Sequence, residues 1–322
     1  MNRILVTGGA GFIGSHLTER LLADGHGVVV LDNFDTFYDP DSKRRNLEGV
    51  TGAAGFLLVE GDIRDGELVE KLFAREGFDA VIHLAARAGV RPSIAEPQLY
   101  VSVNLDGTAE LLEAARRHAV KRFLFGSSSS VYGNNDKVPF SEDDPVDHPV
   151  SPYAATKKAG ELLCHTYHHL FGIAIASLRF FTVYGPRQRP EMAIHKFARL
   201  LASGEEVEQY GDGSAERDYT YVSDIVDGIV LALSRCTRYH IWNLGGSKTT
   251  RLDDLIAKIA EGLGVERRAR ALPMQPGDVD RTWADVSRAR EDLGWAPRVD
   301  LDRGLRLFLD WFQADRESGR RA

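Results

Sequence analysis

The sequence predicts an α/β fold: a doubly wound parallel sheet with a second, smaller α/β lobe. Apolar strand-like runs alternate with amphipathic helix-like segments through about residue 179, and this alternation is typical of a parallel sheet covered by helices. The first apolar run leads directly into a glycine-rich turn. Beyond Arg179 the alternation becomes irregular. We therefore expect a second structural unit to begin there.

The individual elements follow from short apolar runs and from helical periodicity. The strand-like runs of the first part lie at 3–7, 28–32, 56–60, 80–84, 122–127 and 174–179. The helix-like segments of this part lie at 12–24, 65–75, 98–118 and 153–171. In the second part we expect helices near 191–203, 222–233, 252–263 and 302–314, and strands at 207–210 and 241–244. Segments 1–179 and 218–244 are assigned to the first domain, and segments 180–217 and 245–322 to the smaller lobe.

Composition excludes several classes of function. The 322 residues are enough for a large core and two lobes. The net charge of −7 disfavours nucleic acid or an anionic membrane as a partner. No run of eighteen apolar residues and no signal peptide is found, so we expect a cytoplasmic protein that does not enter membranes. Cys164 and Cys236 are expected to be buried thiols, and no cluster has the spacing of a metal site.

The turn after the first strand has the pattern of a dinucleotide-binding loop. It contains Gly8, Gly11 and Gly14, with Phe12 and Ile13 opening the next helix. Glycines there allow a tight turn and close approach of the backbone to a pyrophosphate, and the helix N-terminus offers free N–H groups. The full strand–turn–helix–strand context predicts a Rossmann domain.

The second strand ends at Asp32. A carboxylate at that place accepts hydrogen bonds from a ribose diol and repels a 2′-phosphate, which favours NAD over NADP.

Residues that follow the other strands are expected at the same edge of the sheet. Asp62 and Ile63 are placed to cap the adenine, and the run from Leu84 through Ala85 to Ala86 offers small residues where a cofactor backbone passes. Asn104 interrupts an apolar helix pattern and needs hydrogen-bond partners. It is either a satisfied core residue or one that orders the catalytic strand.

Three side chains make a set for proton and hydride chemistry. Tyr153 and Lys157 are four residues apart in a predicted helix, so they lie on one face. A phenol is a poor base at neutral pH, but a nearby ammonium favours the phenolate. Ser128 follows the strand at 122–127 and can share the substrate proton. The set suits removal of a proton from an alcohol while hydride leaves for NAD. A non-catalytic NAD-binding protein would not need this set intact.

Motifs along nearly the whole chain resemble the extended short-chain dehydrogenase/reductase family, in its nucleotide-sugar epimerase branch. They are GGAGFIG, DN at 32–33, GDIRD at 61–65, HLAA at 83–86, SSSSVYG, SPYAATKKAGE, LRFFTVYGPRQRP, ERDYTYVSD at 216–224 and PGDVDRTWAD at 276–285. The resemblance implies bound NAD, with Asn33 and Phe180 also in its site, and the catalytic set named above. It implies Arg217 and Asp278 near the UDP of a UDP-sugar.

The resemblance also implies a homodimer. Helices near 98–118 and 153–171 would pair across a two-fold axis as a four-helix bundle. The same helices can equally be buried only against their own sheet.

Two serines separate this chain from neighbouring branches. The related dehydratases and UDP-glucuronate decarboxylases carry acidic residues just before VYG, where this chain has Ser129 and Ser130. A hydroxyl cannot act as the carboxyl acid or base that elimination uses. Epimerisation through a 4-keto sugar that is re-reduced on its other face needs no second acid, so it fits.

Segments 86–93 and 181–190 are similar to UDP-glucuronate 4-epimerases, which form UDP-galacturonate. Thr182 stands where UDP-glucose epimerases typically have Asn, and Arg87 and Arg189 are cations that can receive a carboxylate at sugar C6. Either arginine can instead bind phosphate or make a surface ion pair. Ser127 and Ser128 are further candidates for sugar contacts.

Three readings of the substrate remain open. UDP-glucose 4-epimerase is the alternative to the glucuronate enzyme, and UDP-glucuronate decarboxylase fits less well. Epimerases of neutral sugars usually have Arg where Gln275 stands, so we expect the phosphates to be met by Arg217 or Arg281.

Overall fold

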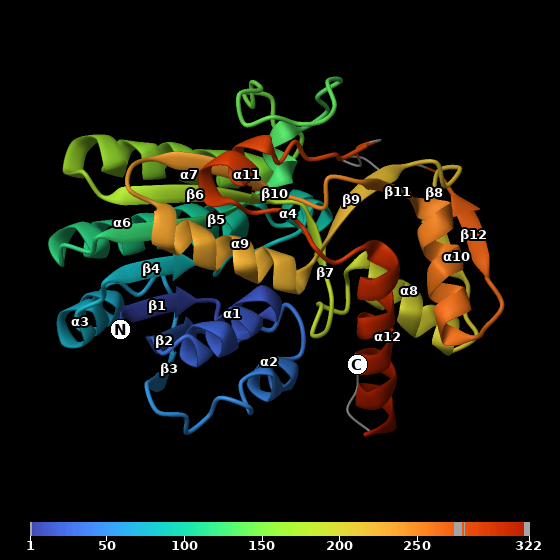
Figure 1. Cartoon of the computed structure of the whole chain (residues 1–322), viewed down its shortest axis with the longest axis horizontal. Helices are drawn as coiled ribbons and strands as arrows, with labels where there is room; N and C mark the ends of the chain where they lie inside the picture. The colour runs from blue at the N-terminus through green and yellow to red at the C-terminus, as the bar shows by residue number, and fades with distance from the viewer. Residues whose placement is uncertain (1, 274–278, 280, 319–322) are drawn as a thin grey trace.

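A computed structural model describes residues 2–273, 279 and 281–318 of the chain (Figure 1). Its main feature is a seven-stranded sheet in the order β10-β6-β5-β4-β1-β2-β3, in which every pair of neighbours is parallel. In that order the strands are His240–Leu244, Ala174–Phe180, Arg122–Ser128, Ala80–His83, Arg3–Thr7, Gly27–Asp32 and Phe56–Glu60. The predicted parallel α/β sheet is confirmed.

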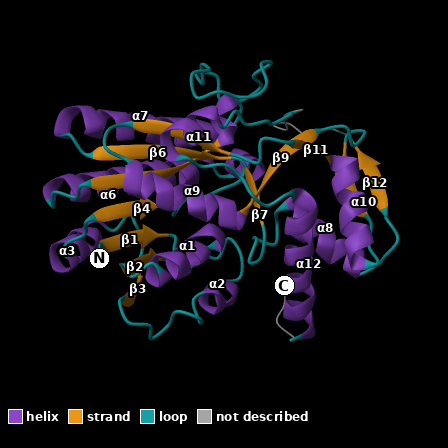
Figure 2. Cartoon of the chain, viewed as in Figure 1, coloured by secondary structure: helices purple, strands orange, loops and turns teal. Residues whose placement is uncertain are grey.

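Helices cover both faces of this sheet (Figures 1 and 2). On one face lie α1 (Phe12–Ala23) and α9 (Val222–Arg235), and on the other lie α3 (Gly66–Glu76), α6 (Gly107–Arg117) and α7 (Pro152–Phe171). Strand side chains alternate between the two faces. In β1, Ile4 and Val6 join one buried cluster and Leu5 joins the other.

The strand order places a crevice at the centre of the sheet. From β1 the chain runs to β2 and β3 on one side, and then returns to β4 and continues outward on the other. Ligands of doubly wound sheets bind at the carboxyl ends of the strands where this reversal occurs. The turn after β1 and the ends of β2, β4 and β5 meet at this edge.

The smaller lobe shares a buried cluster with the face of the main sheet that α1 and α9 cover. It holds a three-stranded sheet, β11-β9-β7, and a two-stranded sheet, β12-β8. The strands β7, β8, β9, β11 and β12 are Thr182–Tyr184, Val207–Tyr210, Glu216–Tyr221, Thr249–Arg251 and Ala269–Leu272. The helices α8, α10 and α12 are Ala193–Ala202, Leu252–Leu263 and Leu301–Glu317. Phe197 and Phe308 of this lobe belong to the same buried cluster as Ile4, so the core runs through both parts.

Several elements differ from the expected pattern. The helix expected at 98–118 is broken into α5 (Pro97–Val101), a π-helical turn at Ser102–Asp106, and α6. The short helices α2 (Pro40–Asn46), α4 (Val90–Ala95) and α11 (Ser287–Leu293) were not expected. Each has only six or seven residues, too few for an apolar period to stand out.

The lobe boundaries stay a prediction. β10 completes the main sheet and α9 packs on α1, while β9 runs across the expected boundary between residues 217 and 218. Within the described ranges, no helix is both long and apolar enough to cross a membrane.

Candidate functional site

A cavity of about 380 Å³ opens at the carboxyl ends of the central strands. It gathers residues from segments that are far apart in the sequence. Those predicted from the sequence are Gly8, Gly11, Phe12, Ile13, Gly14, Asp32, Asn33, Ile63, Leu84, Ala85, Ala86, Arg87, Ser127, Ser128, Tyr153, Lys157, Phe180, Thr182 and Arg189. Most of the expected site therefore lies in one place.

Backbone forms one end of the cavity. Gly8 has φ +70°, and a Cβ at that position would lie 2.7 Å from the backbone nitrogen of Ala85. Only glycine fits a turn that is both left-handed and this close to a neighbouring strand. Helix α1 begins after Gly11, which has no side chain to cap it. The first N–H groups of α1 are therefore available to an anion.

Asp32 closes the same end. Its carboxylate accepts hydrogen bonds from the backbone nitrogens of Ala10 (3.1 Å) and Phe34 (2.9 Å). Burial raises the pKa of Asp32, and the positive charge of Lys43 opposes that rise. The hydroxyl of Tyr38 also lines the cavity and is buried without a hydrogen-bond partner. A dinucleotide fits these three groups: the glycine-rich turn, the Asp32 carboxylate, and the Tyr38 hydroxyl that has no hydrogen-bond partner.

Sequence reasoning missed Asp35, Tyr38 and Lys43. All three line the cavity, and Lys43 donates from Nζ to the Asp35 carbonyl oxygen at 2.7 Å. The signal for them was weak, because the segment after Asp32 has neither helical nor strand periodicity.

Asp62 and Asn104 support the cavity from outside its lining. Asn33 and Arg64 both donate to Asp62, and the hydrogen bond from Arg64 is the main cause that lowers the Asp62 pKa to about 2. Asn104 lies in the π-helical turn and bonds to both backbone groups of Arg87, at 2.8 and 3.0 Å. Its Nδ2 also donates to Thr156 on α7. The amide thus fixes the strand-end loop against the helix that carries Tyr153.

Ser128, Tyr153 and Lys157 all line the cavity. Burial raises the pKa of Tyr153, and a hydrogen bond with Ser128 and the charge of Arg189 oppose that rise. Lys157 donates from Nζ to the Gly126 carbonyl oxygen at 2.7 Å, and burial lowers its pKa to about 8. We expected the Lys157 ammonium to act on the Tyr153 phenol. In the structure it is directed instead at the Gly126 carbonyl oxygen of β5.

Ser127 is turned away from the space beside Tyr153. Its Oγ donates to Glu161 on α7 at 2.6 Å. Glu161 makes a buried two-bond pair with Arg179 of β6, at 2.8 and 2.9 Å. Arg179 in turn donates to the hydroxyl of Tyr132 at 2.9 Å. The expected sugar contact of Ser127 therefore competes with a bond that fixes the end of β5.

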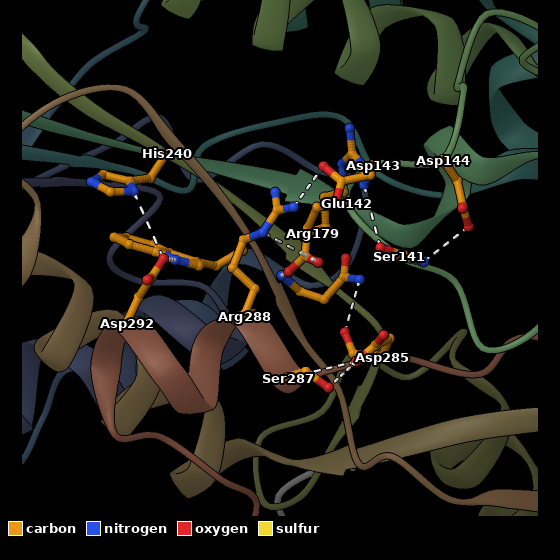
Figure 3. A network of polar contacts seen from close by, with 12 residues as sticks. Ser141, Glu142, Asp143, Asp144, Arg179, His240, Asp285, Ser287, Arg288 and Asp292 are labelled. Atoms are coloured by element: carbon orange, nitrogen blue, oxygen red, sulfur yellow. Dashed lines mark hydrogen bonds and ion pairs between the residues drawn. The ribbon is translucent and has the colours of Figure 1, made fainter.

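This chain of hydrogen bonds reaches a second polar cluster at the surface, drawn in Figure 3. Tyr132 donates to Asn243, whose backbone N–H donates to Glu142 at 2.7 Å. Arg288 points at Glu142 and donates to Asp143 at 2.6 Å (Figure 3). The cluster is satisfied by its own ion pairs and lies outside the cavity.

Charged side chains form a further part of the cavity wall. Arg87 donates to Asp35 at 2.5 Å and to Glu96 at 3.3 Å. Arg189 forms an ion pair with Glu191, with 2.9 Å between Nε and Oε1. The Nε–H of Arg87 is buried without a hydrogen-bond acceptor. Thr182 is the first residue of β7 and also lines the cavity.

The residues expected near UDP lie apart from this cavity or outside the described residues. Arg217 of β9 donates to the Glu216 carbonyl oxygen at 2.9 Å, and Arg281 pairs with the Glu216 carboxylate at 2.7 Å. Neither arginine lines the cavity. Asp278 and Gln275 fall outside the described residues.

The family follows from comparison with known proteins. A family model described as GDP-mannose 4,6 dehydratase matches residues 5–308. This chain belongs to the nucleotide-sugar epimerase and dehydratase branch of the extended short-chain dehydrogenase/reductase family. A UDP-glucuronate 4-epimerase of Thermodesulfobacterium geofontis is 41% identical over 97% of this chain and 96% of its own length.

Solved structures of this family have the same architecture. A UDP-glucuronic acid 4-epimerase from Bacillus cereus, in complex with UDP-glucuronic acid and NAD, is 38% identical with a TM-score of 0.92, over 97% of this chain and 99% of that one. A UDP-glucose 4-epimerase from Thermotoga maritima, with UDP-glucose, is 36% identical with a TM-score of 0.90, over the same shares. The chain is thus an enzyme of an NAD-dependent family, with epimerases of both sugars among its relatives.

Among the described residues, no group of three His, Cys, Asp or Glu side chains is arranged to hold a metal ion.

Proposed function

We propose that this chain is a 4-epimerase that converts UDP-glucuronate to UDP-galacturonate. The observation that carries the proposal is the position of Arg189. Its side chain lines the cavity and lies near enough to Tyr153 for its charge to lower the pKa of that phenol. A sugar with its C4 hydroxyl at Tyr153 has its C6 group nearby. A carboxylate there would accept a charge-assisted hydrogen bond from the Arg189 guanidinium, in competition with Glu191.

The side chains around C4 exchange a single proton. Tyr153 accepts the proton of the C4 hydroxyl at Oη, and Ser128 shares the hydrogen bond. Bound NAD supplies the acceptor, and later the donor, of the C4 hydride. The flat 4-keto sugar turns about its bonds to the pyrophosphate and presents its other face, and Tyr153 then returns the proton. The proton balance over the cycle is zero, as an isomerisation requires.

A glucuronate imposes a further demand on the site. Oxidation at C4 makes a β-keto acid, which readily loses carbon dioxide. The site must hold the carboxylate so that the breaking bond is poorly aligned with the ketone. Thr182 and Arg189 lie on the cavity wall and are our candidates for that restraint.

Ser129 and Ser130 support epimerisation over the other reactions of the family. Both line the cavity, in the 3₁₀ turn that follows Ser128. A hydroxyl at those places cannot serve as the carboxyl acid or base of an elimination. The proposal therefore excludes sugar dehydration and disfavours decarboxylation as the main reaction.

UDP-glucose 4-epimerase is the second candidate. The similarity to the Thermotoga maritima enzyme favours it, and the roles of Ser128, Tyr153 and Lys157 would be unchanged. Only the task of Arg189 would differ.

The test is to incubate the purified protein with UDP-glucuronate and, separately, with UDP-glucose, and to resolve the products by NMR. The proposal predicts UDP-galacturonate from the first and little UDP-galactose from the second. UDP-galactose as the main product would show that the substrate is the neutral sugar UDP-glucose and not UDP-glucuronate. A UDP-pentose as the main product would contradict the argument from Ser130.

We also propose a homodimer formed by α7 and the helices at 97–117. Val101, Leu162 and Leu170 on these helices are 45%, 55% and 61% exposed, and large apolar side chains left exposed on helices favour an interaction site. Light scattering after gel filtration should give twice the mass of one chain. A single-chain mass at micromolar concentration would contradict the proposal.

A further inference from the structure

Residues 185–192, the arginine loop, connect β7 to α8 and carry Arg189 into the cavity. Three successive side chains of this loop point in three directions. Arg187 contacts α1, Gln188 contacts the smaller lobe, and Arg189 lines the cavity. The direction of Arg189 therefore depends on what holds its neighbours.

Arg187 is held by the helix that begins at the glycine-rich turn. Its guanidinium donates to the Glu19 carboxylate at 2.6 Å and to the Ser15 hydroxyl at 3.3 Å. Ser15 is fully buried, and the side chains of Arg187 and Glu19 are 24% and 35% exposed. His16, on the same helix, bonds to the Pro186 carbonyl oxygen at 2.9 Å. Burial lowers the pKa of His16, so this ring is a neutral N–H donor.

The contacts with α1 hold Arg187 in a backbone conformation that is unfavourable for a residue with a side chain. Arg187 has φ +65°, in the left-handed region that residues with a Cβ rarely adopt. Such a conformation persists only where surrounding contacts hold it. The ion pair with Glu19 and the bond from His16 are the contacts that reach this part of the loop from α1.

The other side of the loop is held separately. Gln188 is buried, and its side chain donates to the Val183 carbonyl oxygen at 3.0 Å and accepts from the His195 backbone N–H at 3.2 Å. These bonds anchor the loop to β7 and α8 and do not involve α1. Removing the Arg187 contact would therefore release one side of the loop without unfolding the other.

We infer that Arg187 is a positioning residue for substrate selection: its pairing with Glu19 and Ser15 on α1 turns the loop so that Arg189 faces the sugar. This inference rests on the proposed function of Arg189. It makes the preference for an acidic sugar depend on an ion pair outside the cavity, on the helix whose N-terminus faces the dinucleotide.

The test is a double-mutant cycle between Arg187→Ala and Arg189→Ala. The readout is the ratio of dissociation constants for UDP-glucose and UDP-glucuronate, measured by calorimetry on the NAD-loaded protein. Arg187→Ala should lower the preference for UDP-glucuronate by about tenfold, as expected for weakening a charge-assisted hydrogen bond. In the Arg189→Ala background the same substitution should change nothing further. Independent, additive losses would overturn the inference.

Two further variants keep the test decisive. Arg187→Lys retains a cation for Glu19 and should recover part of the preference, whereas Glu19→Gln should lose part of it. If Arg187→Ala does not fold, Glu19→Gln replaces it in the cycle. An unchanged preference in Glu19→Gln and Arg187→Ala alike would contradict the inference.

A second readout separates this inference from the proposed function. The Arg189 charge lowers the pKa of Tyr153, so displacement of Arg189 should move the acid limb of the kcat profile to higher pH. This shift should appear with whichever of the two sugars the wild-type protein turns over. If wild type prefers UDP-glucose and the acid limb still shifts in Arg187→Ala, UDP-glucuronate is rejected as the substrate, but Arg187 keeps its role in positioning Arg189. An unmoved limb would reject the positioning role.

Discussion

Two parts of the cavity wall differ in composition: a backbone end and a side-chain end. At the dinucleotide end the wall is backbone and small residues, such as Gly8 and Ala85, and a Cβ has no room there. Another part of the wall, where we propose that the sugar binds, is made of the long side chains of Arg87 and Arg189, each held by an ion pair. A backbone wall keeps its shape as long as the sheet is folded. A wall of long side chains has the shape that its neighbours impose, so the substrate can change there while the cofactor stays the same.

The largest expected effect is at the backbone end. Gly8→Ala adds a Cβ 2.7 Å from the Ala85 nitrogen at φ +70°, so we expect loss of bound NAD and destabilisation by several kcal/mol, about 2–4. Gly172→Ala is the matched control, because Gly172 has φ +72° with no atom within 4 Å of the added Cβ. It should cost about 1–2 kcal/mol and keep NAD. Urea unfolding and the NAD content of the purified variants decide; equal losses would show that the close approach is unimportant.

The next largest effect concerns Tyr153. Tyr153→Phe removes the proposed proton acceptor and should lower kcat about 10²–10⁴-fold with either sugar, while NAD stays bound. Tyr100→Phe is the control, since Tyr100 packs edge-on against Tyr153 and donates only to the Ala88 carbonyl oxygen. Its kcat should stay within about threefold of the wild type. More than a trace of activity in Tyr153→Phe would exclude it as the base.

A third effect concerns the cost of burying a cation in the middle of the site. Burial lowers the pKa of Lys157 from 10.5 to about 8, so the folded chain binds fewer protons than the unfolded chain between these values. Stability therefore rises with pH in that window. Lys157→Met removes the titration, so its stability relative to wild type should decline by about 3 kcal/mol between pH 8 and 10.5. Urea unfolding without added NAD checks this, and a flat difference would refute the assignment.

The smallest effect is expected at the side-chain end. Arg189→Ala frees the carboxylate of the 4-keto intermediate to align with the ketone. The fraction of UDP-pentose among the products of UDP-glucuronate should rise by about tenfold, the equivalent of one charge-assisted hydrogen bond. NMR of the product mixture measures it. An unchanged ratio of epimerisation to decarboxylation would remove Arg189 from this role.

The same contrast explains what the sequence could predict. The glycines at 8–14, Asp32 and the Tyr153–Lys157 spacing are local patterns, and a local pattern fixes a strand–turn–helix unit or one face of a helix. The main sheet follows from such units, which is why its strands were expected within one or two residues of their positions.

The remainder depends on contacts between distant segments. Arg87 meets Asp35 across 52 positions, and Arg187 meets Glu19 across 168. No spacing in the sequence encodes either pair. The orientation of Lys157 was missed for a related reason: the helix fixes its face, but the carbonyl oxygen of Gly126 on β5 decides where the ammonium points. Tyr38 and Lys43 lie in a segment without periodicity, which offered no pattern to interpret.

In the proposed function, the arginine side chains of the cavity wall select a sugar acid. The most direct test is the ratio of kcat/KM for UDP-glucuronate to that for UDP-glucose, in wild type and in Arg189→Ala. We predict that wild type favours UDP-glucuronate by at least about tenfold, and that Arg189→Ala loses most of this preference while retaining turnover of UDP-glucose. A wild-type ratio near or below one, or a ratio that Arg189→Ala leaves unchanged, would exclude selection of the sugar acid by Arg189.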